Sequence, residues 1–359
     1  MRIKETFLVP AYYPLFHCKG GSCRHTCCED LSIYIPMEEY NRLVGLECSS
    51  DLRRRLDDAL HILPHPTQDR YACISPDFLG RCRMLTEDGL CRLQKEKGFD
   101  ALTSVCKYFP RSMRFENRQS AISCACEALP EMFLDPLLPS GFLYRQLTFD
   151  LWGKPREEDN EDSHMKSKIH LFLVRGFMDF TVPLENRLSW LTASCAKLQE
   201  DRSCLSSLTP SCMQEKAESI EQQIMKEKDF LITLFAWIKD HYPTMAEYAE
   251  HAEKLLSECN EESLGIAWRR LVRNNAMLET LVNRVLANDL FYREFPFTDG
   301  RLSMTEDAEA FRIIVLCYMA CMLAMKGDME EKELVDLTSA FFRMVELTPF
   351  SHGVISAVA

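Results

Sequence analysis

The feature that most constrains this chain of 359 residues is a dense set of cysteines between Phe16 and Cys126. Eleven of the 17 cysteines lie within the first 126 residues. Thiols at this density form either a disulfide framework or a metal site, and the cellular compartment decides which. Residues 1–10 lack the apolar stretch of a secretory signal, and a chain of this length buries a large core without disulfides. We therefore expect a cytoplasmic protein with a metal centre that is ligated by thiolates.

The motif cysteines outnumber the ligands of one metal site, because tetrahedral zinc and a cubane iron–sulfur cluster each take four protein ligands. Gly20 and Gly21 allow a tight turn within the first motif. Neighbouring side chains diverge in an extended chain, so Cys27 and Cys28 do not readily reach one small ion. Either two sites exist, or some motif cysteines are not ligands. The eight candidate metal ligands are Cys18, Cys23, Cys27, Cys28, Cys82, Cys91, Cys106 and Cys124.

The other cysteines have a second interpretation as small core residues. Cys48, Cys73 and Cys126 fit either role, and we expect the six cysteines after residue 190 to be buried. His17 and His25 flank motif cysteines and could each replace one as a ligand. Basic residues between the cysteines either offset thiolate charge, and could hold a ligand carboxylate, or form a solvated face. These basic residues are Lys19, Arg24, Arg83, Arg92, Lys107 and Arg111.

Hydrophobic spacing predicts a mainly α-helical protein, in which a cysteine-rich metal-binding module (residues 1–128) packs on a helical body (residues 129–359). Residues 1–15 read as an extended lead-in, 61–81 as a loop and 153–165 as an acidic loop. No alternating strand pattern or internal repeat is evident. In residues 1–128 the expected helices are 37–60, 90–97 and a short one that ends at Phe109-Pro110. In residues 129–359 they are two within 166–205 that are parted by Pro183, one from the Thr209-Pro210 cap to about 241, 243–258, 261–295, one from the Ser303–Glu306 capping box to 325, and 330–347.

The charge of −12 is unevenly distributed. Residues 1–126 carry 18 Lys and Arg against 16 Asp and Glu, whereas the remainder carries 24 against 38. An acidic body argues against nucleic acid and suits a basic partner, although acids also simply solvate helix faces. The longest apolar run, residues 313–325, is too short to span a bilayer, so we expect a buried helix and no membrane association.

Several catalytic fingerprints are missing from the sequence. It has no dinucleotide or P-loop glycine motif, no nucleophile elbow and no H-E-x-x-H helix. The three-cysteine motif of the radical S-adenosylmethionine enzymes is also missing, since Cys18-x4-Cys23-x3-Cys27 differs from it by one residue at each gap. The residue patterns alone indicate an α-rich protein with a cysteine-ligated metal centre.

Taken together, the cysteine motifs resemble those of the flagellin lysine-N-methylase family and, less specifically, of cysteine-rich zinc- or iron-chelating domains. One departure is Ser123-Cys124-Ala-Cys126-Glu, where the family usually has Ser-Cys-Pro-Glu, so either Cys124 or Cys126 could be the ligand there. The motifs that carry the resemblance are Cys18-x4-Cys23-x3-Cys27-Cys28, Cys82-Arg-Met-Leu-x-x-Asp-Gly-Leu-Cys91, Cys106-x-Tyr-Phe-Pro-Arg111, Ser123-Cys124 and Asn283-x7-Phe291-x3-Phe295-Pro-Phe297.

This resemblance implies a methyltransferase that moves methyl groups from S-adenosylmethionine to lysine ε-amines of flagellin. It also implies an iron–sulfur cluster, of the 4Fe-4S type, in the enzyme. The cluster either positions the methionine end of the donor or stabilises an N-terminal segment that otherwise lacks a core. The alternative from the residues alone is a non-enzymatic interaction module with zinc in four-cysteine sites.

Overall fold

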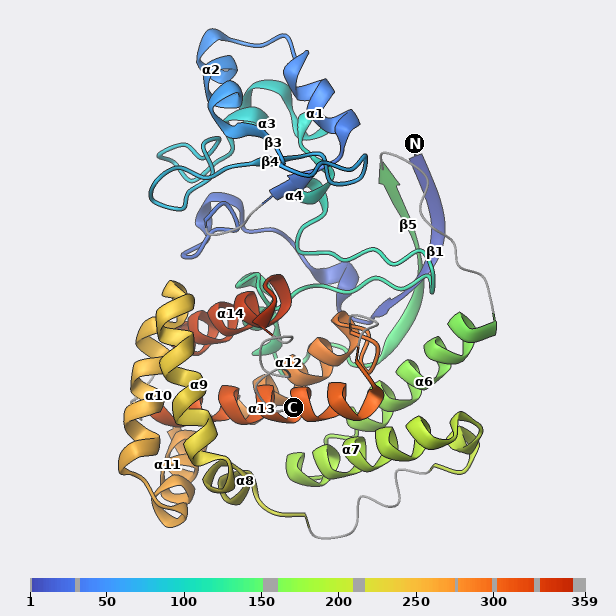
Figure 1. Ribbon diagram of the computed structural model, residues 1–359, viewed down its shortest axis with the longest axis vertical. Coiled ribbons are helices and arrows are strands. Elements are labelled where there is room, and N and C mark those ends of the chain that lie inside the picture. The colour runs from blue at the N-terminus through green and yellow to red at the C-terminus, as the bar shows by residue number, and fades with distance from the viewer. Residues whose placement is uncertain are drawn as a thin grey trace. The chain divides into compact units, whose positions relative to one another are not determined.

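The computed structural model divides the chain into two compact units, which are described separately. The first comprises Met1–Ile122 and Phe142–Glu157, and the second comprises Ser123–Gly141 and Glu158–Ala359. Fourteen α-helices and five strands lie in the described residues, so the mainly α-helical prediction is confirmed in this coarse form (Figure 1). The domain division at residue 128 stays a prediction. The structure describes residues 2–29, 33–150, 161–208, 217–274, 277–298, 302–325 and 330–350.

The expected extended lead-in is a strand, β1 (Arg2–Pro10), and it pairs antiparallel with β5 (Phe142–Asp150). The register runs from Arg2 opposite Asp150 to Pro10 opposite Phe142. Phe7 and Phe149 meet edge to face with ring centroids 5.4 Å apart, and the Phe115 ring contacts both. The expectation of no strands is therefore wrong. The pairing joins segments far apart in sequence, which a local alternation pattern does not reveal.

A second sheet in the first unit has the strand order β2-β4-β3 and is antiparallel throughout. Two of its strands lie within or at the edge of residues 61–81, which the sequence predicted as a loop. Tyr34 of β2 and His61 of β3 both lie opposite Cys73 of β4. The bounds are β2 Ile33–Ile35, β3 Leu60–Ile62 and β4 Ala72–Ile74.

The predicted helix over 37–60 is two helices, α1 (Met37–Val44) and α2 (Ser50–Ala59). The first ends at Gly45 and the second starts at Ser49, whose hydroxyl accepts a hydrogen bond from the backbone of Leu52. Ser49 is thus the N-cap of α2, and a second helix starts there although the apolar spacing continues from one helix to the next. Further short helices follow, namely α3 (Arg92–Lys97) and α4 (Ser104–Tyr108).

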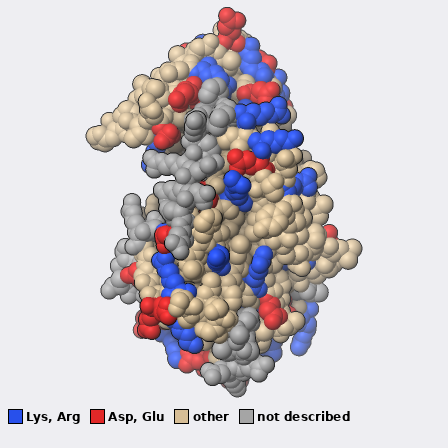
Figure 2. All heavy atoms as spheres, turned by 90° about the vertical axis from the view of Figure 1, so that its right-hand side faces the viewer, with Lys and Arg blue, Asp and Glu red and all other residues tan. Residues whose placement is uncertain are grey.

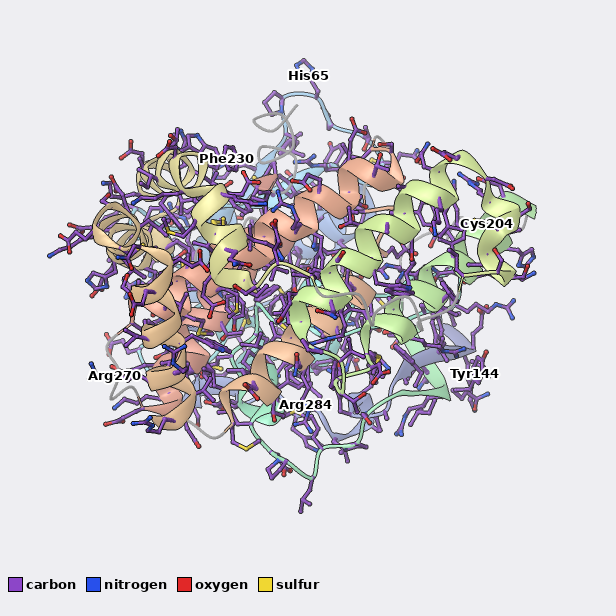
Figure 3. All side chains as sticks on the ribbon, turned by 90° about the horizontal axis from the view of Figure 1, so that it is seen from below. His65, Tyr144, Cys204, Phe230, Arg270 and Arg284 are labelled. Carbon is purple, nitrogen blue, oxygen red and sulfur yellow. The ribbon has the colours of Figure 1, made fainter. Side chains whose placement is uncertain are left out.

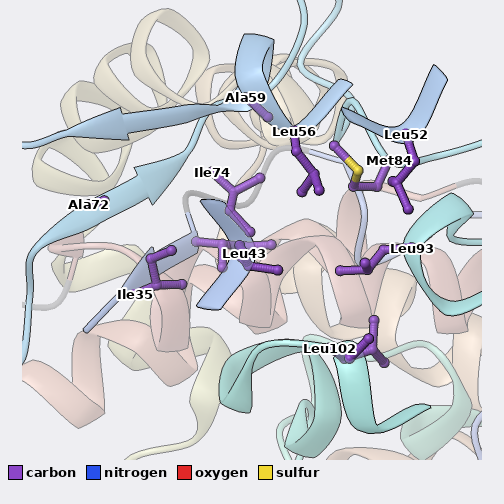
Figure 4. Close-up of a cluster of buried hydrophobic side chains, with 12 residues drawn as sticks. Ile35, Leu43, Leu52, Leu56, Ala59, Ala72, Ile74, Met84, Leu93 and Leu102 are labelled. Carbon is purple, nitrogen blue, oxygen red and sulfur yellow. The ribbon is translucent and has the colours of Figure 1, made fainter. Parts of the chain in front are cut away.

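The first unit has a hydrophobic core of its own (Figure 4). Leucines of α1 and α2 pack with residues of the small sheet and of the segments around α3, and the side chains of Cys48, Cys82 and Cys91 pack against this cluster. The expectation that this segment lacks a core is therefore wrong. The buried members are Ile33, Ile35, Leu43, Leu52, Leu56, Ala59, Ala72, Ile74, Met84, Leu93, Ala101 and Leu102.

The second unit is helical throughout its described residues. Its central helix is α13, which is buried along nearly its whole length and packs against α7, α10, α11 and α14 (Figure 1). The helices are α5 (Ala128–Phe133), α6 (Glu161–Phe177), α7 (Leu184–Glu200), α8 (Ile220–Lys226), α9 (Lys228–His241), α10 (Ala246–Glu258), α11 (Glu261–Asn274), α12 (Leu278–Tyr292), α13 (Met304–Ala324) and α14 (Glu331–Leu347).

Most helix ends in the second unit follow the predicted signals. Pro183 is the N-cap of α7, and Ser303 with Glu306 forms the capping box of α13. Three predicted bounds are wrong. The expected acidic loop 153–165 does not extend past residue 160, because α6 already begins at Glu161, and residues 153–160 lie outside the described residues. The 261–295 helix is divided into α11 and α12, and the long helix is divided at Glu227 into α8 and α9. The proposed Thr209-Pro210 cap lies outside the described residues, and α8 starts instead at a capping box of Ser219 and Gln222. No helix in the described parts of the chain is long and apolar enough to cross a membrane.

The core of the first unit generates a stability prediction. Leu56→Ala should destabilise this unit by about 2–5 kcal/mol, because the side chain is 1 % exposed and its removal leaves a cavity. Leu79→Ala is the matched control, since Leu79 is 57 % exposed, and its effect should stay within about 0.5 kcal/mol. The measurement is hydrogen exchange of the α2 and β4 amides in metal-free protein. Unprotected amides in the metal-free wild type would contradict a core that forms without metal.

Candidate functional site

Four thiols from separate segments of the first unit lie close together: Cys28, Cys82, Cys91 and Cys106. Each of the six possible pairs among them interacts electrostatically, so that one thiolate disfavours ionisation of the next. Four is also the number of ligands that a tetrahedral zinc or a cubane cluster takes from the protein. These four cysteines, called the thiol cluster below, are the strongest candidate site in the first unit.

Backbone contacts hold the first three members of the thiol cluster together. The backbone N–H of Cys82 donates to the carbonyl of Cys28 over 2.6 Å. Cys91 pairs with Leu85 in an isolated β-bridge, and the next N–H, of Arg92, donates to the carbonyl of Met84 over 2.7 Å. The segment between Cys82 and Cys91 is therefore a closed loop with one thiol at each end.

Two helix N-termini position the remaining contacts. Cys91 is the N-cap of α3, and Cys106 lies in the first turn of α4. The N-cap of α4 is Thr103, whose hydroxyl accepts a hydrogen bond from the Cys106 backbone over 3.3 Å. This threonine was not singled out from the sequence. Its signal is the Thr103-x-x-Cys106 spacing, which is that of an N-cap and the third helical residue.

The first cysteine motif reaches the thiol cluster through two glycines. Gly21 lies so close to the Asp88–Gly89 turn that a Cβ atom on it would be 2.9 Å from the Asp88 carbonyl oxygen. Gly89 has φ of +73°, and its own Cβ would lie 3.2 Å from the Gly21 Cα. The two turns thus pack backbone against backbone, which places the loop between Cys18 and Cys23 beside the turn that precedes Cys91.

Cys28 differs from its three partners in acidity. A hydrogen bond from the Cys27 side chain favours the Cys28 thiolate and, with a smaller contribution from Thr26 against the opposing effects of burial and Glu29, lowers the pKa of Cys28 to about 7. Cys27 and Cys28 lie in a turn, so their side chains approach each other where an extended chain would separate them. The chain is thus not extended at these two cysteines, and whether both of them reach one ion stays a prediction.

The other three thiols of the cluster are harder to ionise in the absence of a cation. Burial, followed by the Cys28 and Cys91 charges, raises the pKa of Cys82 to about 12. Burial also raises the pKa of Cys91. The pKa of Cys106 is raised by desolvation of its thiol and by the neighbouring thiolates, although the residue as a whole is exposed. A bound cation would remove this mutual repulsion, because metal ligation deprotonates thiols.

The chemistry of the thiol cluster fits a thiolate-ligated metal or iron–sulfur cluster, since soft sulfur donors select these groups. Among the described residues, no set of three or more histidine, cysteine, aspartate or glutamate side chains is already arranged around a metal position. The predicted metal-binding module stays a prediction.

Comparisons with known proteins connect this chain to enzymes that methylate lysine. It is 29 % identical over 132 residues to the lysine-N-methylases of Salmonella typhimurium and Salmonella choleraesuis. The chain is a distant relative of lysine-N-methylases. It is also 28 % identical over 132 residues to the flagellar biosynthetic protein FliU of Salmonella muenchen. The expected resemblance to the flagellin lysine-N-methylase family is thereby confirmed.

These similarities are partial. The 132 residues are 36 % of this chain and 33 % of each Salmonella lysine-N-methylase, so the chain matches about a third of the length of these relatives. The match to FliU covers 78 % of that protein. No family model matches the chain. No solved structure matches it either.

Four further candidate ligands in the first unit of this lysine-N-methylase relative lie in or beside the first cysteine motif. Cys18 is exposed and accepts a hydrogen bond from the Gly20 N–H over 3.4 Å, while Cys23 is half-buried. His17 and His25 are exposed. Whether any of these four is a ligand stays a prediction. Cys48, by contrast, packs against the hydrophobic core.

Two of the interleaved cations have structural partners. Arg92 lies 3.7 Å from Asp51 and 3.4 Å from Glu96. Arg111 donates to the carbonyl of Phe16 over 3.1 Å and lies over the Tyr13 and Phe16 rings. For these two residues a structural role is sufficient.

Cys124 belongs to the second unit, where its side chain is fully buried. The side-chain amide of Asn288 donates to its sulfur over 3.2 Å, and its own N–H donates to Glu346 over 3.4 Å. Burial, then the charges of Glu346 and Asp289, raises the pKa of this thiol well above its ordinary value. Glu346 also accepts a hydrogen bond from the Ser123 hydroxyl. The place of Cys124 in a ligand set stays a prediction, as does the choice between it and the half-buried Cys126.

The later cysteines follow the expectation of core residues with one exception. Cys195, Cys259, Cys317 and Cys321 are buried, as expected. Cys204 is only half-buried and lies in a 3-10 helix at the outer edge of the view in Figure 3. Cys212 lies outside the described residues.

The unequal acidity of the cluster predicts selective alkylation in metal-free protein. Iodoacetamide should modify Cys28 well before Cys82 at pH 7, because the thiolate is the nucleophile and only the Cys28 pKa is near 7. The Cys28 rate should rise between about pH 6 and 8 and then level off, since ionisation of Cys28 is then complete. Peptide mass spectrometry after timed quenching measures both rates. Equal rates, or a Cys28 rate that still rises tenfold per unit above pH 8, would contradict the hydrogen bond from Cys27.

Proposed function

We propose that this chain is a methyltransferase that moves methyl groups from S-adenosylmethionine to lysine ε-amines of flagellin. The names of its relatives support methylation of lysine and a role in flagellar biosynthesis. The observation that carries the proposal within the molecule is the thiol cluster, which offers four soft donors where the resemblance implies an iron–sulfur cluster. In this proposal Cys28, Cys82, Cys91 and Cys106 hold the iron–sulfur cluster.

The chemical step needs only a neutral amine and an aligned methyl donor. The nitrogen lone pair of the lysine forms a bond to the methyl carbon while the carbon–sulfur bond breaks, and the bonding electrons remain on sulfur as a neutral thioether. The methylated ammonium then returns a proton to solvent. The protein must therefore remove the proton of the lysine, exclude water and hold the two reactants in line.

The iron–sulfur cluster, when bound, would supply an iron for the methionine end of the donor, which would have to take the coordination position of one of the four thiolates, because four thiolates occupy all four irons of a cubane. A purely structural role is less well supported, because the first unit already has a hydrophobic core that includes Leu43, Leu52 and Leu56. Cys82 and Cys91 both pack against that core, so their backbone is held in place before any metal binds. We therefore propose that the role of the iron–sulfur cluster is to position the methyl donor.

A zinc centre remains the rival occupant, because four thiolates also suit tetrahedral zinc. The two occupants differ in an observable way. Protein purified without oxygen should be brown and contain iron with labile sulfide if the proposal holds, whereas a colourless protein with only zinc supports a non-enzymatic interaction module.

The proposal predicts that substitution of a thiol-cluster cysteine lowers activity, whereas substitution of another cysteine in the same unit does not. Cys91→Ser and Cys106→Ser should each lower methyl incorporation into flagellin at least about tenfold, because a lost ligand weakens metal binding by that order. Cys48→Ser is the matched control in the same unit, since Cys48 packs on the core and lies outside the thiol cluster. Its activity should stay within about twofold of wild type.

The measurement is transfer of radiolabelled methyl groups from S-adenosylmethionine to purified flagellin, with circular dichroism as a check on folding. Wild-type rates in both serine variants would contradict a role for the thiol cluster. Absence of transfer by wild-type protein that contains iron and sulfide would contradict the proposed enzyme activity itself.

A further inference from the structure

A second site candidate lies in the helical unit. It is a cavity of about 430 Å³, which is in the usual size range for pockets that bind small molecules or side chains. All its lining residues belong to the second unit. The α6–α7 connection, the N-terminal turns of α7, α8 and α12, and one face each of α11 and α13 form its walls.

Part of the cavity lining is apolar and aromatic. Trp268 of α11 and Phe180 of the α6–α7 connection line the cavity and are both half-buried. Val282 of α12 and Met319 and Leu323 of α13 also line it and are buried. An alkyl chain or a flat organic group can be desolvated against such a surface.

Three carboxylates also line the cavity, and each comes from the first turn of a different helix. They are Glu185 of α7, Glu221 of α8 and Glu279 of α12. None of these three side chains forms a hydrogen bond or a close ion pair with another described residue, although the charge of Glu185 does act on Arg187 in the same cavity. Arg269 approaches the same side of Gly265 as Glu221, but the two do not form an ion pair there.

Arg187, the one cation among the described residues that line the cavity, is already bonded to the protein. Arg187 is 1 % exposed, and its three side-chain nitrogens donate to the carbonyls of Val182 and Phe177 and to the side-chain oxygen of Asn283. Its guanidinium also lies 4.7 Å from the Phe177 ring centroid and 5.3 Å from that of Phe180. Arg187 therefore builds the wall and is poorly placed to receive an anion.

We propose that this cavity binds an alkylammonium group, as carried by a lysine side chain, with the chain against Trp268 and the positive charge facing Glu185 and Glu221. First-turn carboxylates also stabilise their own helices, so their presence alone would not assign a ligand. The combination decides: apolar and aromatic lining side chains, among them Trp268, together with carboxylates that form no close ion pair, suit an amphipathic cation. The inference rests on the proposed function for the choice of lysine as the ligand.

The test uses the full-length protein and Nα-acetyl-lysine methylamide as the probe, with binding followed by ligand-observed NMR. Nα-acetyl-norleucine methylamide, which lacks the ammonium group, should bind at least about tenfold more weakly. Glu185→Gln with Glu221→Gln should weaken binding of the lysine probe by about tenfold or more and leave the norleucine probe unchanged. Trp268→Leu should weaken both probes.

The matched control is Glu262→Gln, because Glu262 is also a first-turn carboxylate, on α11, but is exposed and outside the cavity. Its lysine affinity should equal that of wild type. Equal affinity of wild type for the lysine and norleucine probes, or undiminished lysine binding in a folded Glu185→Gln, Glu221→Gln variant, would overturn the inference. Tighter binding of inorganic phosphate than of the lysine probe would overturn it as well.

Two further arms separate this inference from its rivals. Displacement of the lysine probe by S-adenosylmethionine, but not by the neutral S-adenosylhomocysteine, would overturn lysine as the ligand and assign the cavity to a sulfonium cation. If the lysine probe binds in a carboxylate-dependent way but the protein has no methyltransferase activity, the proposed function is contradicted and the cavity is supported as a lysine site. If the Glu185→Gln, Glu221→Gln variant transfers methyl groups with an unchanged KM for flagellin, the proposed function is supported and the cavity is contradicted as a lysine site.

Discussion

The account of the first unit depends on four thiols that the fold brings into one neighbourhood, where ionisation of one opposes ionisation of the next. The hydrogen bond from the Cys82 N–H to the Cys28 carbonyl, and the bridge between Leu85 and Cys91, fix the backbone independently of the side chains. The thiols therefore remain neighbours although ionisation of one opposes ionisation of the next. Ionisation of neighbouring thiols is unfavourable when no cation is present, but it becomes favourable when the thiolates share a bound cation. This is why we interpret the thiol cluster as a metal site.

The hydrophobic core beneath the thiol cluster changes what a metal would contribute. In small domains without a core, metal binding supplies the folding free energy. Here leucines of α1 and α2 pack against the β2-β4-β3 sheet, and two of the four cysteines rest on that core (Figure 4). A metal would therefore act mainly on local side-chain order around Cys28, Cys82, Cys91 and Cys106.

Several local signals in the sequence predicted the observed elements correctly. The Ser303–Glu306 capping box, Pro183 before α7 and the apolar run of α13 all led to the observed elements. The pairing of β1 with β5 was missed because its register depends on residues distant in the chain. The four cysteines of the thiol cluster were among the eight candidates, but which of the eight share a neighbourhood follows from backbone contacts that spacing alone does not encode.

The cavity of the second unit could not be predicted from sequence for a similar reason. No sequence motif singles out Glu185, Glu221 or Trp268, and only the packing of α7, α8, α11 and α12 brings them together. The acidic excess after residue 126 was visible, yet its location was not. In the view of Figure 2, acidic and basic side chains are interspersed over that face, so the excess charge does not form one continuous patch there.

The central claim is that Cys28, Cys82, Cys91 and Cys106 together hold one iron–sulfur cluster. Its most direct test is the content of iron and acid-labile sulfide per chain in protein purified without oxygen, compared with a variant in which all four cysteines are serine. The account predicts about four iron and four sulfide per wild-type chain, as in a cubane cluster, and neither in the variant. Full iron and sulfide content in the quadruple variant, or zinc alone in the wild type, would contradict it.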